Sequence, residues 1–407
     1  MEGGLRSRHF CFKLRAAMKF PLWRWALIAL LLAVRPLASD AVILYRTGDP
    51  AANSTAPGGP LNGSGWQFQG VWGAFLGTPI APHFFLSAKH VGQAGAVFTF
   101  GGINYTLVKE FGDPNSDLDL WQVVETFPIF APLYTKSDEA GRLTLVIGRG
   151  TQRGSDVLVN GTFSGWGWGP GDGVQRWGEN LISTIVTPSP DNDFLYGTFD
   201  AVGLIEEATL SAGDSGGAAF IKDGSLWKLA GIHYAVDGPY YLDALGNGGF
   251  NAALFDSRGL YISDEGSPPH YTLITGGAPV PAGFYPTRIS SKLGWIYSVT
   301  DPSGDLDADG KSNLLEYALH TNPIASDAAS LPAVAIEGSF LTLTYSKVTT
   351  ATDIQYSVEE STDLATWTAA NPTDQIVATQ GNVQTIKAQV AINGASRLFL
   401  RLRITRL

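Results

Sequence analysis

Residues 213–217 read Gly213-Asp214-Ser215-Gly216-Gly217, and the choice of fold class depends on what surrounds them. A serine hydroxyl that acts as a nucleophile must be exposed on a tight turn, and flanking glycines let the backbone turn and a substrate approach. Backbone N–H groups of such a turn can also stabilise a negatively charged oxygen. The stretch therefore predicts a turn that presents Ser215 as a nucleophile.

The same five residues also fit the G-x-S-x-G nucleophile turn of α/β-hydrolases, so the order of the other residues must separate the two architectures. In those enzymes the acid and the histidine follow the serine, whereas here His90 and Asp117 precede Ser215. His90 follows the apolar stretch Phe84–Ala88, and Asp117 precedes the alternating stretch Leu118–Val124. No alternation of strands and helices surrounds Ser215, which also argues against an α/β-hydrolase.

Three motifs in this order resemble those of trypsin-like serine proteases. Residues 84–90 (FFLSAKH) resemble the strand-plus-histidine motif, residues 115–121 (NSDLDLW) the aspartate motif, and residues 213–217 the serine motif. Weaker likenesses lie at residues 165–167, 229–232 and 249–251. The resemblance covers about residues 60–262 and departs from the family in having no cysteine there.

The resemblance implies a role for each residue. Ser215 would attack the peptide carbonyl, His90 would take its proton and pass it to the leaving amine, and Asp117 would orient the histidine. The N–H groups of Gly213 and Ser215 would form the oxyanion hole. Asp119 stays open as an alternative acid, because it lies two residues along the same strand face.

The resemblance also places the substrate pocket. Thr209, six residues before the serine, would lie at its base, and because Thr209 is not acidic a preference for Arg or Lys is not expected. Tyr234 and Val236 would line the wall, and Val236 would narrow it. We therefore expect a small or medium apolar side chain at P1, the residue on the acyl side of the cleaved bond.

The predicted fold class is all-β. Residues 42–265 contain short apolar or alternating runs broken by Gly, Pro, Asn and Asp, which favours a two-barrel, chymotrypsin-like domain. Residues 266–300 are rich in Gly and Pro and are predicted to be a linker with little secondary structure. Residues 331–407 are predicted to form a small β-sandwich module, which resembles those appended to exported bacterial proteins.

Residues 1–41 are predicted to be a signal peptide. Basic residues precede Trp25–Val34, an apolar run too short to span a membrane, and cleavage is expected after Ala38 or Ala41. A membrane anchor is the alternative. We expect a secreted, periplasmic or cell-surface protein without disulfides, because Cys11, the only cysteine, lies in this segment. The resemblance to trypsin-like proteases implies a structural role for Asp214, which a new N-terminal amine would pair with if the chain is activated by cleavage.

Residues 301–325 contain a candidate calcium loop. Asp305 to Glu316 fit the twelve-residue pattern D-x-D-x-D-G-x₅-E, which resembles the EF-hand-like loops of dockerins and other exported bacterial proteins. A short helix is predicted over Ser312–Leu319, but no helix before the loop and no second loop to pair with it. We therefore expect the loop to bind Ca²⁺ in a structural role. A solvated acidic turn that binds no cation is the alternative. The expected ligands are Asp305, Asp307, Asp309, the Lys311 carbonyl, Asn313 and Glu316.

The chain carries a net charge of −10, which argues against nucleic acid and anionic lipid as partners, because like charges repel. The leading hypothesis is an exported, Ca²⁺-stabilised serine endopeptidase that acts on proteins or peptides and needs no cofactor for catalysis. A non-catalytic adhesive protein and an α/β-hydrolase esterase are the alternatives. The C-terminal module would attach the protein to a surface or secretion partner, or only stabilise it.

Overall fold

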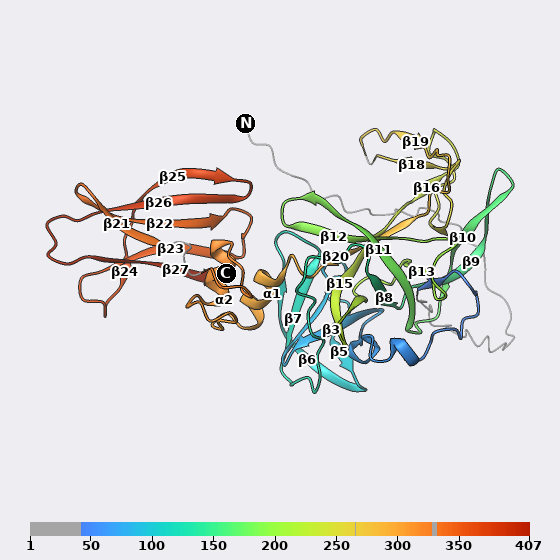
Figure 1. Ribbon diagram of the computed structural model, residues 1–407, viewed down its shortest axis with the longest axis horizontal. Coiled ribbons are helices and arrows are strands. Elements are labelled where there is room, and N and C mark those ends of the chain that lie inside the picture. Colours follow the sequence, from blue (N-terminus) through green and yellow to red (C-terminus); the bar gives the residue numbers. More distant parts are fainter. Residues whose placement is uncertain (1–41, 265, 328–331) are drawn as a thin grey trace, which may run out of the picture. The chain divides into compact units, whose positions relative to one another are not determined.

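The computed structural model describes residues 42–264, 266–327 and 332–407 (Figure 1). The predicted signal peptide lies outside these residues, so its cleavage stays a prediction. Within the described ranges, no helix has both the length and the apolar character that crossing a membrane requires.

The first closed barrel has six strands, and its interior is aromatic. Phe85 and Phe98 stack with ring centroids 3.9 Å apart, and a side chain at Gly77 would collide with both rings. Alternation along each strand supplies these inward residues. The strands, in barrel order, are β2 (Gly70–Trp72), β3 (Phe75–Ala81), β4 (Phe84–Ala88), β7 (Leu118–Val123), β6 (Ile103–Gly112) and β5 (Val97–Phe100).

The second closed barrel also has six strands. One large apolar cluster joins the two barrels, because Leu86 and Leu120 of the first pack in the same cluster as Ile147 and Ile232 of the second. Loops from both barrels therefore meet above a shared core. The strands of the second barrel are β11 (Arg176–Ser189), β12 (Asn192–Thr198), β20 (Gly283–Arg288), β15 (Leu226–Val236), β14 (Ala218–Asp223) and β8 (Leu143–Gly148).

The prediction that residues 266–300 have little secondary structure is wrong. β20 closes the second barrel between β12 and β15, and helix α1 (Leu293–Thr300) follows it. Pro286 made this segment look unlike a strand in the sequence, because proline is rare inside sheets. In the structure Pro286 lies opposite His233, where the register of β15 and β20 shifts, and such irregularities tolerate proline. β19 (Tyr271–Leu273) also lies in this segment, and it pairs with β18 (Tyr261–Ser263), which precedes the segment.

Smaller sheets decorate the second barrel. β9 (Thr151–Val159), β10 (Thr162–Gly171) and β17 (Ala252–Leu254) form a three-stranded sheet. β1 (Ile43–Leu44) pairs with β13 (Ala208–Thr209), and β16 (Tyr240–Tyr241) pairs with β18. The β1–β13 pairing brings the start of the described chain close to the segment that leads into residues 213–217.

The C-terminal residues form two sheets, drawn in orange to red in Figure 1. Leu343 and Ile386 of one sheet share a buried cluster with Val358 of the other and with Leu319 of helix α2 (Asn313–Leu319). The all-β, two-barrel fold with a short helix and C-terminal sheets is thus confirmed. The sheets consist of β21 (Ala333–Glu337), β22 (Phe340–Val348), β26 (Val383–Ala391) and β25 (Thr373–Gln380), and of β24 (Thr368–Ala369), β23 (Ile354–Ser361) and β27 (Phe399–Arg406).

Candidate active site

Strand pairing in the first barrel brings His90 and Asp117 together. β4 and β7 are antiparallel with Ala88 opposite Leu118, so the residues just after β4 and just before β7 lie at the same end. His90 sits in a 3₁₀ turn after β4, and its backbone N–H donates to Asp117 Oδ1 at 2.9 Å. Its Nδ1 lies 2.6 Å from Asp117 Oδ2. The carboxylate therefore fixes both the backbone and the ring of His90.

Ser215 reaches the other side of the same ring. Its Oγ lies 2.8 Å from His90 Nε2, on the turn that leads into β14. Because Nδ1 faces a carboxylate, the neutral ring carries its proton on Nδ1, and Nε2 is left to accept the serine proton. The three residues that the sequence nominated as a triad thus lie in one hydrogen-bonded chain.

Asp119, the alternative acid, does not take part in this chain. It lies inside β7 opposite Ser87 and is fully buried, and its carboxylate interacts with Glu110 rather than with the ring of His90. Burial, and then the neighbouring Glu110, raise the pKa of Asp119 to about 7. Asp117, not Asp119, is the carboxylate that holds His90.

The turn at Ser215 requires glycine. Gly213 and Gly216 have φ of +92° and +75°, in the region that side chains rarely adopt. A side chain at Gly216 would also come within 2.4 Å of Ser87 Oγ and 2.5 Å of the Leu76 carbonyl. In the described part of the chain, the N–H groups of Gly213 and Ser215 donate no hydrogen bond, so both are available to a substrate oxygen.

The buried side chain of Asp214 anchors this turn to neighbouring segments of the chain. Its buried carboxylate accepts hydrogen bonds from the N–H groups of Val42 at 3.1 Å, Gly150 at 2.7 Å and Ser211 at 2.8 Å. Burial raises the pKa of Asp214 to about 6, although these hydrogen bonds act in the opposite direction. The turn that carries Ser215 is therefore tied to the beginning of β1.

A cavity of about 170 Å³ opens beside Ser215. Tyr234 and Val236 line it, where the sequence placed them, but Thr209 does not. Thr209 is buried in β13, paired with Ile43 of β1, which keeps it away from this cavity. Sequence reasoning missed other lining residues, which only the structure reveals: Trp168, Leu210, Ser211, Ala212 and His233.

The acidic loop brings most of its expected ligands together. Carboxylate oxygens of Asp305, Asp307 and Asp309 lie within 4.8 Å of one another, and Asp309 forms a second such group with Glu316 and Asp327. Asp327 was not foreseen, because it lies eleven positions beyond the motif. Helix α1 ends shortly before the loop, although no helix was expected there.

Several atoms in this loop are short of partners, as expected at a cation site. Asp307 Oδ2, Asn313 Oδ1 and Glu316 Oε2 are buried and have no hydrogen-bond partner among the described residues. Burial, and then nearby Asp307 and Asp309, raise the pKa of Glu316 to about 7. The Lys311 side chain pairs with Asp309 at 2.6 Å and with Asp327 at 2.8 Å. The acceptors present fit a hard cation such as Ca²⁺.

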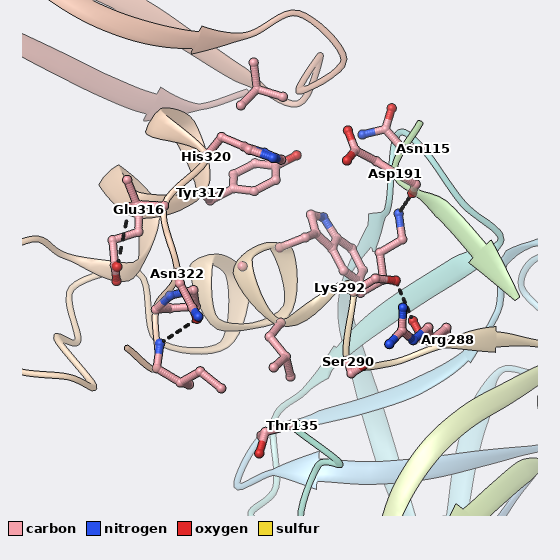
Figure 2. Close-up of a pocket in the computed structure, with 18 of the residues that line it drawn as sticks. Asn115, Thr135, Asp191, Arg288, Ser290, Lys292, Glu316, Tyr317, His320 and Asn322 are labelled. Atoms are coloured by element: carbon pink, nitrogen blue, oxygen red, sulfur yellow. Dashed lines mark hydrogen bonds between the residues drawn. The ribbon is translucent and has the colours of Figure 1, made fainter. Parts of the chain in front are cut away.

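Another cavity, of about 590 Å³, lies apart from the one beside Ser215 (Figure 2). Its cations are already paired: Lys292 lies 2.7 Å from Asp113, and Arg288 lies 2.8 Å from Glu139. Neither the triad residues nor the cavity beside Ser215 contributes to its lining. We therefore assign it no part in catalysis.

Comparisons with known proteins give only weak structural likenesses. No protein-family model and no curated protein matches the chain. Kallikrein-related peptidase 10 matches with 15% identity over 59% of this chain and 98% of its own, at a TM-score of 0.32. An inactive form of Rv3671c from M. tuberculosis H37Rv matches with 13% identity over 61% of this chain and 98% of its own, at a TM-score of 0.33.

A third solved structure, the murine norovirus NS6 protease in an inactive form, matches with 14% identity. The match covers 53% of this chain and 97% of that one, at a TM-score of 0.28. All three are named as proteases or peptidases, but at these scores the fold assignment rests on the strand pairings of the chain itself.

Proposed function

We propose that this chain is an exported serine endopeptidase. The observation that carries the proposal is the single imidazole of His90, which lies 2.6 Å from the Asp117 carboxylate and 2.8 Å from the Ser215 hydroxyl. An acid, a base and a hydroxyl linked in this order form an activated nucleophile. The free N–H groups of Gly213 and Ser215 supply the remaining requirement for acyl transfer.

Each step then uses a group already in place. As Ser215 Oγ bonds to the peptide carbonyl carbon, its proton moves to His90 Nε2, and the carbonyl oxygen becomes an oxyanion held by the two N–H groups. Asp117 stabilises the imidazolium through Nδ1–H. The imidazolium gives its proton to the leaving amine, and water repeats the sequence in reverse to release the acyl group.

The calcium loop forms a second, structural part of the proposal. Asp305, Asp307, Asp309, Asn313, Glu316 and the Lys311 carbonyl would hold Ca²⁺, and the placement of Asp327 makes it a further candidate ligand. The cation would supply only charge compensation and rigidity.

Active-site labelling tests the catalytic proposal. A fluorophosphonate probe should label the purified protein, and Ser215→Ala and His90→Ala should each abolish labelling and casein digestion. Ser183→Ala, at an exposed serine in β11 whose hydroxyl lies 3.4 Å from that of Thr198, is the matched control and should be labelled like wild type. A folded wild-type protein that neither reacts with the probe nor digests casein would refute the proposal.

That refuting outcome would favour the adhesive alternative, in which the same fold and the C-terminal module bind without turnover. The esterase alternative of the α/β-hydrolase class is already wrong, because Ser215 leads into an antiparallel barrel strand.

A further inference from the structure

The segment that carries Asp117 is a short loop closed at its base by Asp113. The N–H of Asp113, directly after β6, donates to the carbonyl of Leu118, the first residue of β7, at 2.8 Å. Inside the loop, the Asp113 carboxylate accepts hydrogen bonds from the N–H of Asn115 at 3.2 Å and from the hydroxyl of Ser116. The loop is therefore folded around Asp113, and Asp117 lies next to its closing bond.

The same loop is tied to the catalytic histidine through Lys89. The N–H of Lys89 donates to the Asp117 carbonyl at 2.7 Å, and its ammonium group donates to the Asp113 carbonyl at 2.9 Å. Asp117 Oδ1 in turn accepts from the N–H of His90 at 2.9 Å. A displacement of Asp113 would therefore be transmitted to both Asp117 and His90.

The cation that pairs with Asp113 comes from the other barrel. Lys292 lies between β20 and α1, and its Nζ is 2.7 Å from Asp113 Oδ2. Both side chains are buried, Asp113 being 1% and Lys292 3% exposed. The ammonium group also donates to the backbone carbonyl of Asp191 (Figure 2). Removing one partner of such a pair leaves an uncompensated buried charge.

We infer that Asp113 and Lys292 are positioning residues, and that their ion pair holds Asp117 against His90 from the second barrel. The inference rests on the proposed peptidase function. Neither residue lines the cavity beside Ser215, so the pair acts through the loop and not on the substrate.

Helix α1 gives Lys292 a rigid base. The Lys292 carbonyl accepts from the N–H of Ile296 at 2.9 Å, and its N–H donates to the Ile289 carbonyl at 2.9 Å. Leu293, Trp295 and Ile296 belong to the apolar cluster that the two barrels share. This packing fixes the ammonium group relative to the first barrel. Such support matters because a shift of about 1 Å in a catalytic group can lower the rate about a hundred-fold.

A second buried ion pair provides a comparison for stability alone. Arg288 lies 2.8 Å from Glu139, whose side chain is fully buried, and both pairs include a residue on the wall of the cavity of about 590 Å³. The Glu139 carboxylate also accepts from the hydroxyl of Ser290. Its partners thus lie in or directly after β20, and none of these bonds reaches the loop that carries Asp117.

Lys292→Met and Arg288→Met, compared with wild type, test the inference. Each variant should lower the stability in urea, because each breaks a buried pair. Only Lys292→Met should lower kcat for a peptide substrate, by about ten- to a hundred-fold. Its KM should stay within about two-fold of wild type, because the substrate cavity is untouched. Arg288→Met should keep both kinetic constants.

A spectroscopic measurement separates positioning from general destabilisation. The proton between His90 Nδ1 and Asp117 Oδ2, atoms 2.6 Å apart, should give a low-field signal in the NMR spectrum of the wild type. That signal should shift or broaden in Lys292→Met and remain in Arg288→Met. Asp113→Asn, which keeps the shape of the side chain, should reproduce the effects of Lys292→Met. If Lys292→Met does not fold, Asp113→Asn decides by the same two readouts.

The outcomes separate the two proposals. An active wild type whose kcat and low-field signal survive in Lys292→Met, or are lost equally in Arg288→Met, overturns the positioning role and leaves the peptidase proposal standing. A folded wild type that neither reacts with a fluorophosphonate probe nor cleaves peptides overturns the peptidase proposal, and the positioning role falls with it.

Discussion

The two oxygens of Asp117 make different contacts with His90, one to its backbone N–H and one to its ring. Asp117→Asn would keep the first contact but could present an amide N–H to Nδ1, which forces the ring proton onto Nε2, where it blocks proton transfer from Ser215. We expect kcat to fall about 10⁴-fold with the fold intact. Steady-state kinetics together with circular dichroism measure this, and a loss below ten-fold would contradict the role of Asp117.

Asp119 should influence stability rather than catalysis. Its folded-state pKa is raised from 3.8 to about 7, so between these values the folded protein holds a proton that the unfolded chain releases. Its contribution to stability is therefore present below about pH 4 and is lost as pH rises through about 7. Relative to its effect at pH 3, Asp119→Asn should stabilise the protein at pH 8 by at most about 4 kcal/mol, and at pH 5 by less than half of that amount.

Urea unfolding of wild type and Asp119→Asn at these pH values tests this expectation. Because Asp214 and Glu207 also have raised pKa values, both proteins should lose stability with rising pH, and the informative quantity is the difference between them. An equal difference at pH 5 and pH 8 would show that Asp119 does not titrate as described.

At the same scale, the sequence predicted the reacting residues better than the pocket. His90, Asp117 and Ser215 each lie in a motif whose chemistry requires that residue type, so their positions could be nominated directly. His233 and Trp168 lie within strands, and nothing in a strand pattern tells which side chains will line the cavity beside Ser215. Thr209 was misplaced because β1 pairs with β13, and that contact joins residues about 165 positions apart.

At the scale of elements, β1 connects the start of the described chain to the catalytic turn. All the groups that donate to Asp214 are neutral, and one of them is the N–H of Val42 at 3.1 Å. Cleavage after Ala41, one of the two expected sites, would turn that N–H into an ammonium group and pair it with the buried carboxylate. We therefore expect the active form to begin at Val42.

Two preparations test this expectation, one released from a fusion so that it begins at Val42 and one that begins at Ser39. The Val42 form should have a kcat/KM at least about ten-fold higher, since breaking a buried ion pair costs several kcal/mol and distorts the turn. N-terminal sequencing of the exported protein gives a second readout. Equal activity of the two forms would contradict the expected pairing.

Elements were predictable where their apolar pattern was regular. β4 and β7 were found because buried residues dominate them, whereas β21 and β25 are exposed along their whole length and carry no such pattern. β20 was missed for another reason: its membership in the second barrel depends on pairing with β12 and β15, which lie some 50 to 90 residues earlier. The Gly- and Pro-rich composition of residues 266–300 predicted a linker there instead.

At the scale of the whole described chain, the acidic loop lies in sequence between α1 and α2, each of which packs against a different core. Trp295 and Ile296 of α1 belong to the cluster shared by the two barrels, and Leu319 of α2 belongs to the core of the C-terminal sheets. Arg406 near the end of β27 also donates to Ser298 of α1 at 2.5 Å. A cation in this loop would therefore stiffen the connection between two separately packed cores.

Calcium should accordingly raise the thermal stability of the protein. Saturation at about 100 times the dissociation constant adds about 2.7 kcal/mol, which corresponds to an increase of roughly 3–4 °C in Tm for a body of this size. Glu316→Gln keeps the shape of the side chain but removes the charge at the buried, unpaired Oε2, so it should abolish most of the increase. Glu337→Gln, on the exposed strand β21, should retain the full response. Calorimetric scans with Ca²⁺ and with a chelator measure the effect in all three proteins. Identical melting of the wild-type protein in both conditions would contradict the calcium site.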